Sequence, residues 1–196
     1  MNLHPDRKKW NEKYTENGPQ TFGKDPSKWL VAHEELLVKQ PKGKALDVAC
    51  GNGRNSFFLA ELGFDVDAID ISDVVIKWLK GEAEKRKLLV KPRWDNIETC
   101  ELPREVFQVI ISFNFLERGI FSKLTEALAP EGLLLFETLT EDHIDVLKKK
   151  FNRKYALRKD ELRHSFPELK TISYREEIVA DRGSKAALAS LVARKL

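Results

Sequence analysis

The chain has 196 residues, of which 42% are hydrophobic and 33% are charged, and its formal net charge is +3. This length is enough for one domain with a three-layer core, and the composition indicates a soluble globular protein. The small net charge does not by itself favour a polyanionic partner such as a nucleic acid.

The sequence shows no pattern for export, membrane insertion or metal binding. Residues 1–10 lack the apolar stretch of a signal peptide, and no apolar run approaches membrane length. The two cysteines, Cys50 and Cys100, have neither metal-ligand spacing nor a disulfide framework. We therefore expect a cytoplasmic protein with no metal site and no membrane contact.

Two helices are predicted before the first strand. Trp10 and Tyr14 lie four residues apart in a polar segment, so they share one face of a helix that ends at Asn17-Gly18-Pro19. Asp25-Pro26 is typical of a helix start, with an N-cap followed by proline, and a second helix is expected from there.

The next segment has the pattern of a strand, a turn, a helix and a second strand. Ala45–Cys50 is a short apolar run that carries one acid, Asp47, and it stops at the turn Gly51-Asn52-Gly53. A helix follows, and a second apolar run, Phe64–Ile69, ends at Asp70.

The chemistry of this unit points to a bound nucleoside. Gly51 and Gly53 let the backbone turn sharply and approach a ligand without a Cβ in the way. Asp70 follows the second strand, where doubly wound sheets place an acid against a ribose diol. Because Ser56 stands at the third position of the G-x-G-x-x-G fingerprint, a dinucleotide is the weaker interpretation.

A further helix and a strand follow this unit. Ser72-Asp73 is predicted to cap the helix, and residues 88–94 follow as a strand that contains Pro92. Proline is tolerated only where strand N–H groups need no partner, so this strand should lie at a sheet edge. Asp95-Asn96-Ile97 comes directly after it.

The second half continues with alternating elements. Val106–Phe113 is a buried strand by composition, and Glu117–Leu128 has apolar residues at helical spacing. Pro130-Glu131-Gly132 is predicted as a turn before another buried strand, Leu133–Thr138.

Residues 141–166 are predicted to be helical and basic. From residue 148 to 166 the chain has eight Lys or Arg residues against two acids. One interpretation is a surface for nucleic acid or an anionic substrate. The other, which we prefer, is a solvated helix face above buried Ile144, Leu147 and Phe151.

The end of the chain is predicted to be a β-hairpin. Leu169–Val179 and Lys185–Lys195 have the composition of strands, and Ala180-Asp181-Arg182-Gly183-Ser184 joins them. Because so short a connection allows only an antiparallel pair, the two strands should be hydrogen-bonded neighbours.

The segment LDVACGNGR, with the later LGFDVDAIDIS, resembles motif I and the following acid of class I S-adenosylmethionine-dependent methyltransferases. The alanine-cysteine variant, the glycine-arginine pair and the compact size are most similar to the small tellurite-resistance-type branch. The resemblance covers the chain from about residue 10 to its end. It implies an α/β, three-layer Rossmann-like fold whose seven-stranded, mostly parallel sheet has one antiparallel strand in a C-terminal hairpin. It also implies a single domain, with residues 1–40 as a helical lid and residues 41–196 as the core.

The resemblance implies S-adenosylmethionine as cofactor and S-adenosylhomocysteine as product. In that family the glycine turn faces the methionine part, the acid after the second strand holds the ribose, and an acid after the third strand takes the adenine amino group. The residues that the resemblance assigns to cofactor binding are Asp47, Cys50, Gly51, Gly53, Asp70, Ile71, Asp95, Asn96, Ile97 and Phe113.

The methyl acceptor is predicted to be a small molecule, with a thiol or a metalloid as the class that suits this branch. Candidate substrate residues are Trp10, Tyr14, Arg54, Asn114 and Arg118, with Phe22 as a further lid residue. The aromatic residues have an alternative role in packing, and Arg118 has one in a surface ion pair. No catalytic base is assigned, because a soft nucleophile such as a thiolate needs none.

Other functions stay open at this point. Phe113-Asn114-Phe115 lacks the prolines found in enzymes that methylate amino groups of bases, so that activity is disfavoured. An RNA or protein methyltransferase would use the basic stretch 148–166. A non-catalytic cofactor-binding protein is kept open by two departures from the family pattern, Gln108 and Glu131. We expect a monomer or a homodimer.

Overall fold

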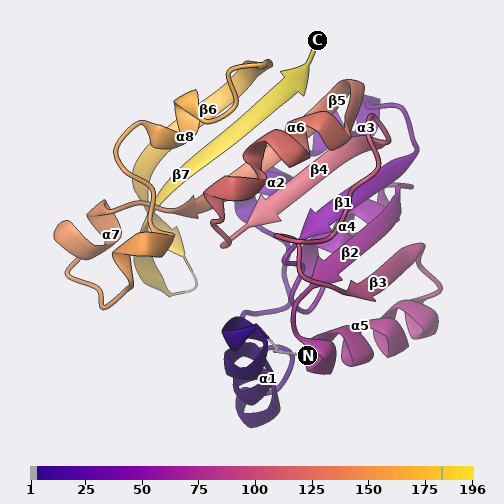
Figure 1. Ribbon diagram of the computed structural model, residues 1–196, viewed down its shortest axis with the longest axis horizontal. Helices are drawn as coiled ribbons and strands as arrows, with labels where there is room; N and C mark the ends of the chain where they lie inside the picture. The colour runs from indigo at the N-terminus through magenta and orange to yellow at the C-terminus, as the bar shows by residue number, and fades with distance from the viewer. Residues whose placement is uncertain (1–3, 182) are drawn as a thin grey trace. The chain divides into compact units, whose positions relative to one another are not determined.

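The computed structural model describes residues 4–181 and 183–196 (Figure 1). The chain divides into two compact units, Met1–Glu101 and Leu102–Leu196, and each is described by itself. The single domain remains a prediction. No helix among the described residues is both long and apolar enough to cross a membrane.

The first unit contains the predicted strand–turn–helix–strand pattern. Its elements are α1 (Pro5–Asn17), α2 (Lys28–Val31), α3 (Glu34–Lys39), β1 (Lys44–Val48), α4 (Arg54–Glu61), β2 (Asp65–Asp70), α5 (Asp73–Arg86) and β3 (Val90–Trp94). β1 pairs in parallel with β2, with Val48 opposite Ile69, and β2 pairs in parallel with β3. Parallel pairing brings the carboxyl ends of all three strands to one edge, so the turn after β1 and the acid that ends β2 become neighbours.

The predicted edge strand and helix cap are confirmed. β3 is the terminal strand of the sheet order and carries Pro92, whose missing N–H needs no partner there. Ser72 is the N-cap of α5, and its hydroxyl oxygen accepts a hydrogen bond from the backbone N–H of Val75 (3.3 Å).

The prediction of one helix starting at Asp25-Pro26 is wrong in its start and in its continuity, because the structure has two short helices that begin later. The first, α2, begins at Lys28 and ends before the separate helix α3 begins at Glu34. The physical reason is that the residues before α2 are bound by the glycine turn and α4. Asn52 Nδ2 donates to the carbonyl of Gly23 (2.8 Å), and Arg54 Nη1 donates to that of Asp25 (2.8 Å).

The second unit contains most of the remaining predicted elements. They are β4 (Phe107–Phe113), the 3-10 turn η1 (Arg118–Ile120), α6 (Phe121–Ala127), β5 (Leu128–Leu139), α7 (Asp142–Asp145), the 3-10 turn η2 (Arg153–Tyr155), α8 (Glu161–His164), β6 (Leu169–Asp181) and β7 (Ser184–Lys195). β4 and β5 are parallel, and β7 is antiparallel to both β5 and β6. The closing hairpin is therefore confirmed. Residue Arg182 of its predicted connection lies outside the described residues.

The predicted turn at Pro130-Glu131-Gly132 lies inside β5, as an irregularity of that strand. The pairing of β4 with β5 shifts between Phe107 and Val109, and Glu131 has a left-handed φ of 61°. Glycine adopts this conformation without strain, so a glutamate at this position carries a backbone cost that glycine would not. Arg194 Nη1 donates to the carbonyl of Glu131 (3.0 Å) and holds the glutamate in this conformation.

The helix predicted over residues 141–166 is wrong. Only Asp142–Asp145 and Glu161–His164 are α-helical, and the segment instead bonds to β5, where Leu157 N–H donates to the carbonyl of Leu139 (2.9 Å). Phe151, expected to be buried, is 39% exposed. Phe166 is buried in its place and packs on Phe121, with their ring centroids 4.8 Å apart.

The predicted fold class is confirmed. The strands form a seven-stranded mixed sheet in the order β3-β2-β1-β4-β5-β7-β6, and β7 is the strand that runs antiparallel to its neighbours. The sheet strands supply much of the buried core, including Leu46 and Val66 in the first unit and Ile110 and Leu135 in the second.

Candidate functional site

The glycine turn between β1 and α4 cannot carry side chains at its two glycines. Gly51 and Gly53 have left-handed φ values of 54° and 71°. A Cβ at Gly53 would lie 2.3 Å from Leu79 Cδ1, and a Cβ at Gly51 would lie 2.9 Å from the Tyr14 hydroxyl. Backbone conformation and close packing therefore both favour glycine at these two positions.

Asp70 ends β2 with its carboxylate held by two backbone N–H groups. Gly51 N–H donates to Oδ2 (2.9 Å), and Ser72 N–H donates to Oδ1 (2.9 Å). Burial raises the pKa of Asp70, and these backbone donors oppose that rise. Each carboxylate oxygen has a second lone pair, so this group can still accept two hydrogen bonds from a diol.

Asp47 and Cys50 lie buried around the start of the turn. Ser56 Oγ donates to Asp47 Oδ2 (2.6 Å) and so joins β1 to α4. Burial raises the pKa of Asp47 to about 7. Burial, with the nearby Asp70 and Asp47 carboxylates, raises the pKa of the Cys50 thiol well above its usual value. Cys50 is therefore a neutral, packed thiol at physiological pH and not a nucleophile.

The residues after β3 are brought next to Asp70, as their predicted role in cofactor binding requires. Asp95 N–H donates to the carbonyl of Asp70 (3.1 Å), and Asp95 Oδ1 accepts from Asn96 N–H (2.9 Å). Ile97 is buried. Trp94 Nε1 donates to the carbonyl of Ile71 (3.0 Å), a link that the sequence interpretation missed.

Helix α1 is bound to the start of α5, beside Asp70. Asn11 Nδ2 donates to Asp73 Oδ1 (2.7 Å), and Asn11 Oδ1 accepts from the Ser72 hydroxyl (2.7 Å). Arg7 Nε also donates to Asp73 Oδ1 (2.9 Å). The sequence interpretation missed Arg7 and Asn11. They lie one helical turn apart, and polar residues on a helix are ordinarily assigned to its solvent face.

The predicted lid aromatics form one cluster. Trp10 and Tyr14 have ring centroids 6.1 Å apart, and Phe22 lies 5.9 Å from Trp10 and 6.3 Å from Tyr14. Such separations are those of favourable edge or tilted aromatic pairs. Arg54, another predicted substrate residue, donates to the carbonyl of Asp25 and thereby holds the loop that follows Phe22.

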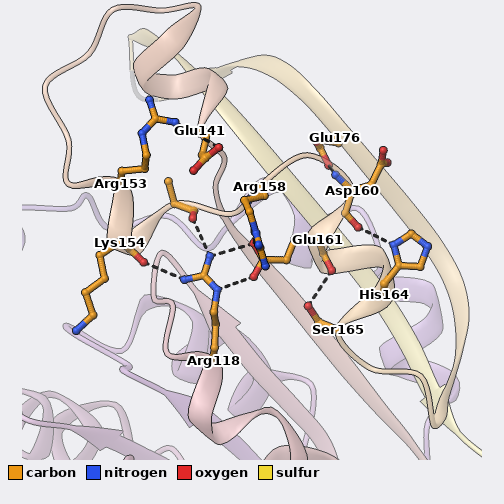
Figure 2. Close-up of polar contacts among 11 residues, drawn as sticks. Arg118, Glu141, Arg153, Lys154, Arg158, Asp160, Glu161, His164, Ser165 and Glu176 are labelled. Carbon is orange, nitrogen blue, oxygen red and sulfur yellow. Dashed lines mark hydrogen bonds and ion pairs between the residues drawn. The ribbon is translucent and has the colours of Figure 1, made fainter.

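Phe113, Asn114 and Arg118 belong to the second unit. Phe113 is buried at the end of β4, and Asn114 is exposed with a left-handed φ of 59°. Figure 2 shows the Arg118 guanidinium facing Glu161, with Nε–Oε1 and Nη2–Oε2 distances of 2.5 and 3.0 Å. Arg118 also donates to the carbonyls of Lys154 and Ala156 (2.9 and 3.0 Å). These bonds favour the structural role of Arg118.

Part of the positive charge in the basic stretch is paired with acids. Arg153 lies 3.3 Å from Glu141 and binds Asp145 through both of its terminal nitrogens, and Arg158 Nε lies 3.3 Å from Glu161 Oε2.

Among residues 4–181 and 183–196 no group of three or more His, Cys, Asp or Glu side chains could hold a metal ion.

Comparisons with known proteins agree with this geometry. The sequence profile of the family described as "Tellurite resistance protein TehB" matches residues 31–183. The ubiquinone biosynthesis O-methyltransferase of Bradyrhizobium diazoefficiens is 32% identical over 104 residues, which are 50% of this chain and 41% of that protein. The eEF1A lysine and N-terminal methyltransferase of Mus musculus is 34% identical over 125 residues, 60% of this chain and 18% of that protein.

The fold is shared with solved structures. TehB from Haemophilus influenzae superimposes with a TM-score of 0.73 and 21% identity, over 97% of this chain and 67% of that chain. The chain spans less than half the length of the curated relatives it matches.

Proposed function

We propose, because this chain belongs to the tellurite resistance protein TehB family of class I S-adenosylmethionine-dependent methyltransferases, that it transfers a methyl group from S-adenosylmethionine to a small molecule. The observation that carries this proposal is the Asp70 carboxylate, fixed by Gly51 N–H and Ser72 N–H beside a turn with no side chains at its glycines. A carboxylate in that setting suits a ribose diol, and a bare backbone suits the methionine end of the cofactor.

The residues present fit the cofactor. Asp70 would hold the ribose hydroxyls, and the backbone at Gly51 and Gly53 would face the methionine part. The segment Asp95-Asn96-Ile97 would serve the adenine. When bound, the cofactor supplies a methyl group on a positively charged sulfur, which is already activated for displacement. The protein then has to bind and align the two reactants and exclude water.

A soft, small nucleophile is the acceptor class that this site supports best. A thiolate or a reduced metalloid attacks without losing a proton, so it needs no general base. Burial raises the pKa values of Cys50 and Tyr14, so neither group beside the turn takes up a proton from an acceptor near neutral pH. We further propose that the protein works in the cytoplasm as a monomer or a homodimer.

A transfer assay tests this proposal. Methyl-labelled S-adenosylmethionine is incubated with the protein and a panel of small thiols, reduced selenium and tellurium compounds, RNA and a protein lysate. Label is expected in a small-molecule product, with the rate lost in Asp70→Ala. Label in RNA or protein alone would contradict the small-molecule proposal.

The alternative acceptor, RNA or protein bound by residues 148–166, is the less favoured one. Ion pairs of Arg153 and Arg158 with acidic residues neutralise part of the charge on which it depends. Binding of RNA through phosphates weakens steeply with salt. A steep dependence of RNA binding on salt in a filter-binding experiment would support that alternative. No binding at about 50 mM salt would remove it.

A further inference from the structure

The side chain of Tyr14 is buried, and its hydroxyl has no hydrogen-bond partner among the described residues. The residue is 5% exposed, and none of the side chains or backbone groups in the described part of the chain forms a hydrogen bond with its oxygen. A tyrosine hydroxyl has one donor and two acceptor lone pairs. Because no described residue bonds to them, they can bond to a ligand at the glycine turn.

Tyr174 gives the contrast within the same chain. Its hydroxyl donates to Glu176 Oε2 at 2.6 Å, so it is satisfied by the protein itself. Tyr174 lies on β6, in the second unit, whereas Tyr14 lies on α1 in the unit that contains the glycine turn. One tyrosine hydroxyl thus has a protein partner and the other has none among the described residues. Tyr174 is therefore a suitable control for mutation of Tyr14.

The Tyr14 hydroxyl is aimed at the glycine turn. A Cβ built on Gly51 would lie 2.9 Å from this oxygen, so no protein side chain separates them. The position is fixed by the rest of α1, since Asn11 is bonded to Ser72 and Asp73 one turn earlier. Trp10 and Phe22 pack against the ring at 6.1 and 6.3 Å.

The groups around this hydroxyl identify the part of the ligand that it faces. Asp70, which is proposed to hold the ribose, lies near this hydroxyl. Burial is the largest cause of the raised pKa of Tyr14, and the negative charge of Asp70 is the next. Gly51, which also lies beside this hydroxyl, belongs to the turn proposed to face the methionine part. In S-adenosylmethionine the sulfur joins ribose to methionine, so we expect a group that lies close to both of these sites to lie near the sulfur.

We propose that the Tyr14 hydroxyl contacts the sulfonium end of the cofactor, with its oxygen lone pairs toward the positive charge, and so favours S-adenosylmethionine over S-adenosylhomocysteine. This inference rests on the proposed function and adds a residue to that site. Methyl transfer leaves the sulfur neutral, because the sulfur keeps the electron pair of the broken carbon–sulfur bond. The product therefore loses the attraction that Tyr14 provides to the substrate cofactor.

The test is calorimetric binding of S-adenosylmethionine and S-adenosylhomocysteine to wild type, Tyr14→Phe and Tyr174→Phe. For Tyr14→Phe we expect about tenfold weaker binding of S-adenosylmethionine and a change of less than about twofold for S-adenosylhomocysteine, as for loss of one charge-assisted contact. Tyr174→Phe should leave the ratio of the two affinities unchanged. An unchanged ratio in Tyr14→Phe, whether both affinities stay or both fall together, would overturn the inference.

Two further readouts keep the test decisive. Because the hydroxyl has no protein partner, Tyr14→Phe should melt no lower than wild type. If this variant does not fold, Asn11→Ala replaces it, because this change loosens α1 and keeps Tyr14. Asn11→Ala should lower the affinity for S-adenosylmethionine relative to that for S-adenosylhomocysteine. An unchanged ratio of these two affinities would then overturn the inference. A wild type that binds neither ligand contradicts the proposed function itself. A wild type that binds both, with unchanged ratios in the variants, contradicts only the role of Tyr14.

Discussion

The backbone N–H of Gly51 donates a 2.9 Å hydrogen bond to Oδ2 of Asp70, across 19 residues of sequence. This bond joins the turn after β1 to the end of β2. It fixes the orientation of the one carboxylate on which the proposed cofactor site depends. The other carboxylate oxygen accepts from Ser72 N–H, and Ser72 is also where Asn11 of α1 is attached. The glycine turn, Asp70 and helix α1 are therefore parts of one hydrogen-bonded network.

Gly53→Ala should destabilise the fold strongly. The new Cβ would lie 2.3 Å from Leu79 Cδ1, and φ at this position is 71°. We expect a loss of about 2–4 kcal/mol in the free energy of unfolding, from steric overlap and backbone strain together. Gly81→Ala is the control, because Gly81 lies within α5 with nothing within 4 Å of an added Cβ. It should gain about 0.5–1 kcal/mol. Equal effects in urea denaturation would contradict the packing argument.

Asp47→Asn should change how stability depends on pH. Burial raises the pKa of Asp47 to about 7 in the folded protein, while the ordinary value of an aspartate in the unfolded chain is about 3.9. Between these values the folded state holds a proton that the unfolded state has released, so the contribution of Asp47 to stability falls as pH rises from about 4 to about 7. The slope can reach about 1.4 kcal/mol per pH unit. Asp47→Asn removes this term, and parallel stability curves for variant and wild type would show that Asp47 does not titrate in this way.

Arg118→Lys should loosen the segment from Lys154 to Glu161. One ammonium group cannot reproduce the fork that binds both oxygens of Glu161 and two backbone carbonyls. We expect a loss of about 1–2 kcal/mol, reduced from the value for a buried pair because Arg118 is partly exposed. Arg104→Lys, in the more exposed pair with Glu126, should change stability by less than about 0.5 kcal/mol. Comparable losses in the two variants would assign Arg118 no special role.

The same ion pair predicts sensitivity to acid. The Arg118 guanidinium, as the largest cause, lowers the pKa of Glu161 to about 2. A carboxylate with a lowered pKa stabilises the fold above its unfolded value, about 4.3 for glutamate, and that contribution is lost as pH falls through the window from about 4 to about 2. Glu161→Gln should flatten this part of the stability curve. An unchanged curve between these pH values would exclude the pair as a source of acid stability.

The two cysteines should differ in their reaction with an alkylating reagent. Cys50 is buried and its thiol has a raised pKa, whereas Cys100 is partly exposed. Thiolate is the reactive form, so iodoacetamide near neutral pH should modify Cys100 first. Cys100→Ser should leave a protein that reacts slowly until it is unfolded. Fast modification of Cys50 in the folded protein, located by peptide mass spectrometry, would contradict its buried position.

The glycine turn, Asp70 and the parallel strands were predictable because their signals are local. A glycine pair after an apolar run and an acid at the end of the next one define the strand ends directly, and parallel pairing brings those ends together. Pro92 similarly identified β3 as an edge strand, because the ring removes a hydrogen-bond donor at a known position.

The anchoring of α1 could not be predicted in this way. Asn11 and Ser72 are 61 residues apart, and nothing in the local pattern pairs them. The helix predicted over residues 141–166 was wrong for a related reason. The local sequence favoured a helix, but Arg118, 43 residues before Glu161, binds Glu161 and holds the segment in an irregular path. Contacts of this range override local helix propensity, which is a weak preference.

The central claim is that Asp70 and the glycine turn bind an adenosyl cofactor. Calorimetric titration of wild type and Asp70→Asn with S-adenosylmethionine, S-adenosylhomocysteine and NAD tests it most directly. We predict micromolar binding of both adenosyl ligands by wild type, a loss of at least about tenfold in Asp70→Asn, and no binding of NAD. Binding of NAD alone, or equal binding of the adenosyl ligands by both proteins, would contradict the account.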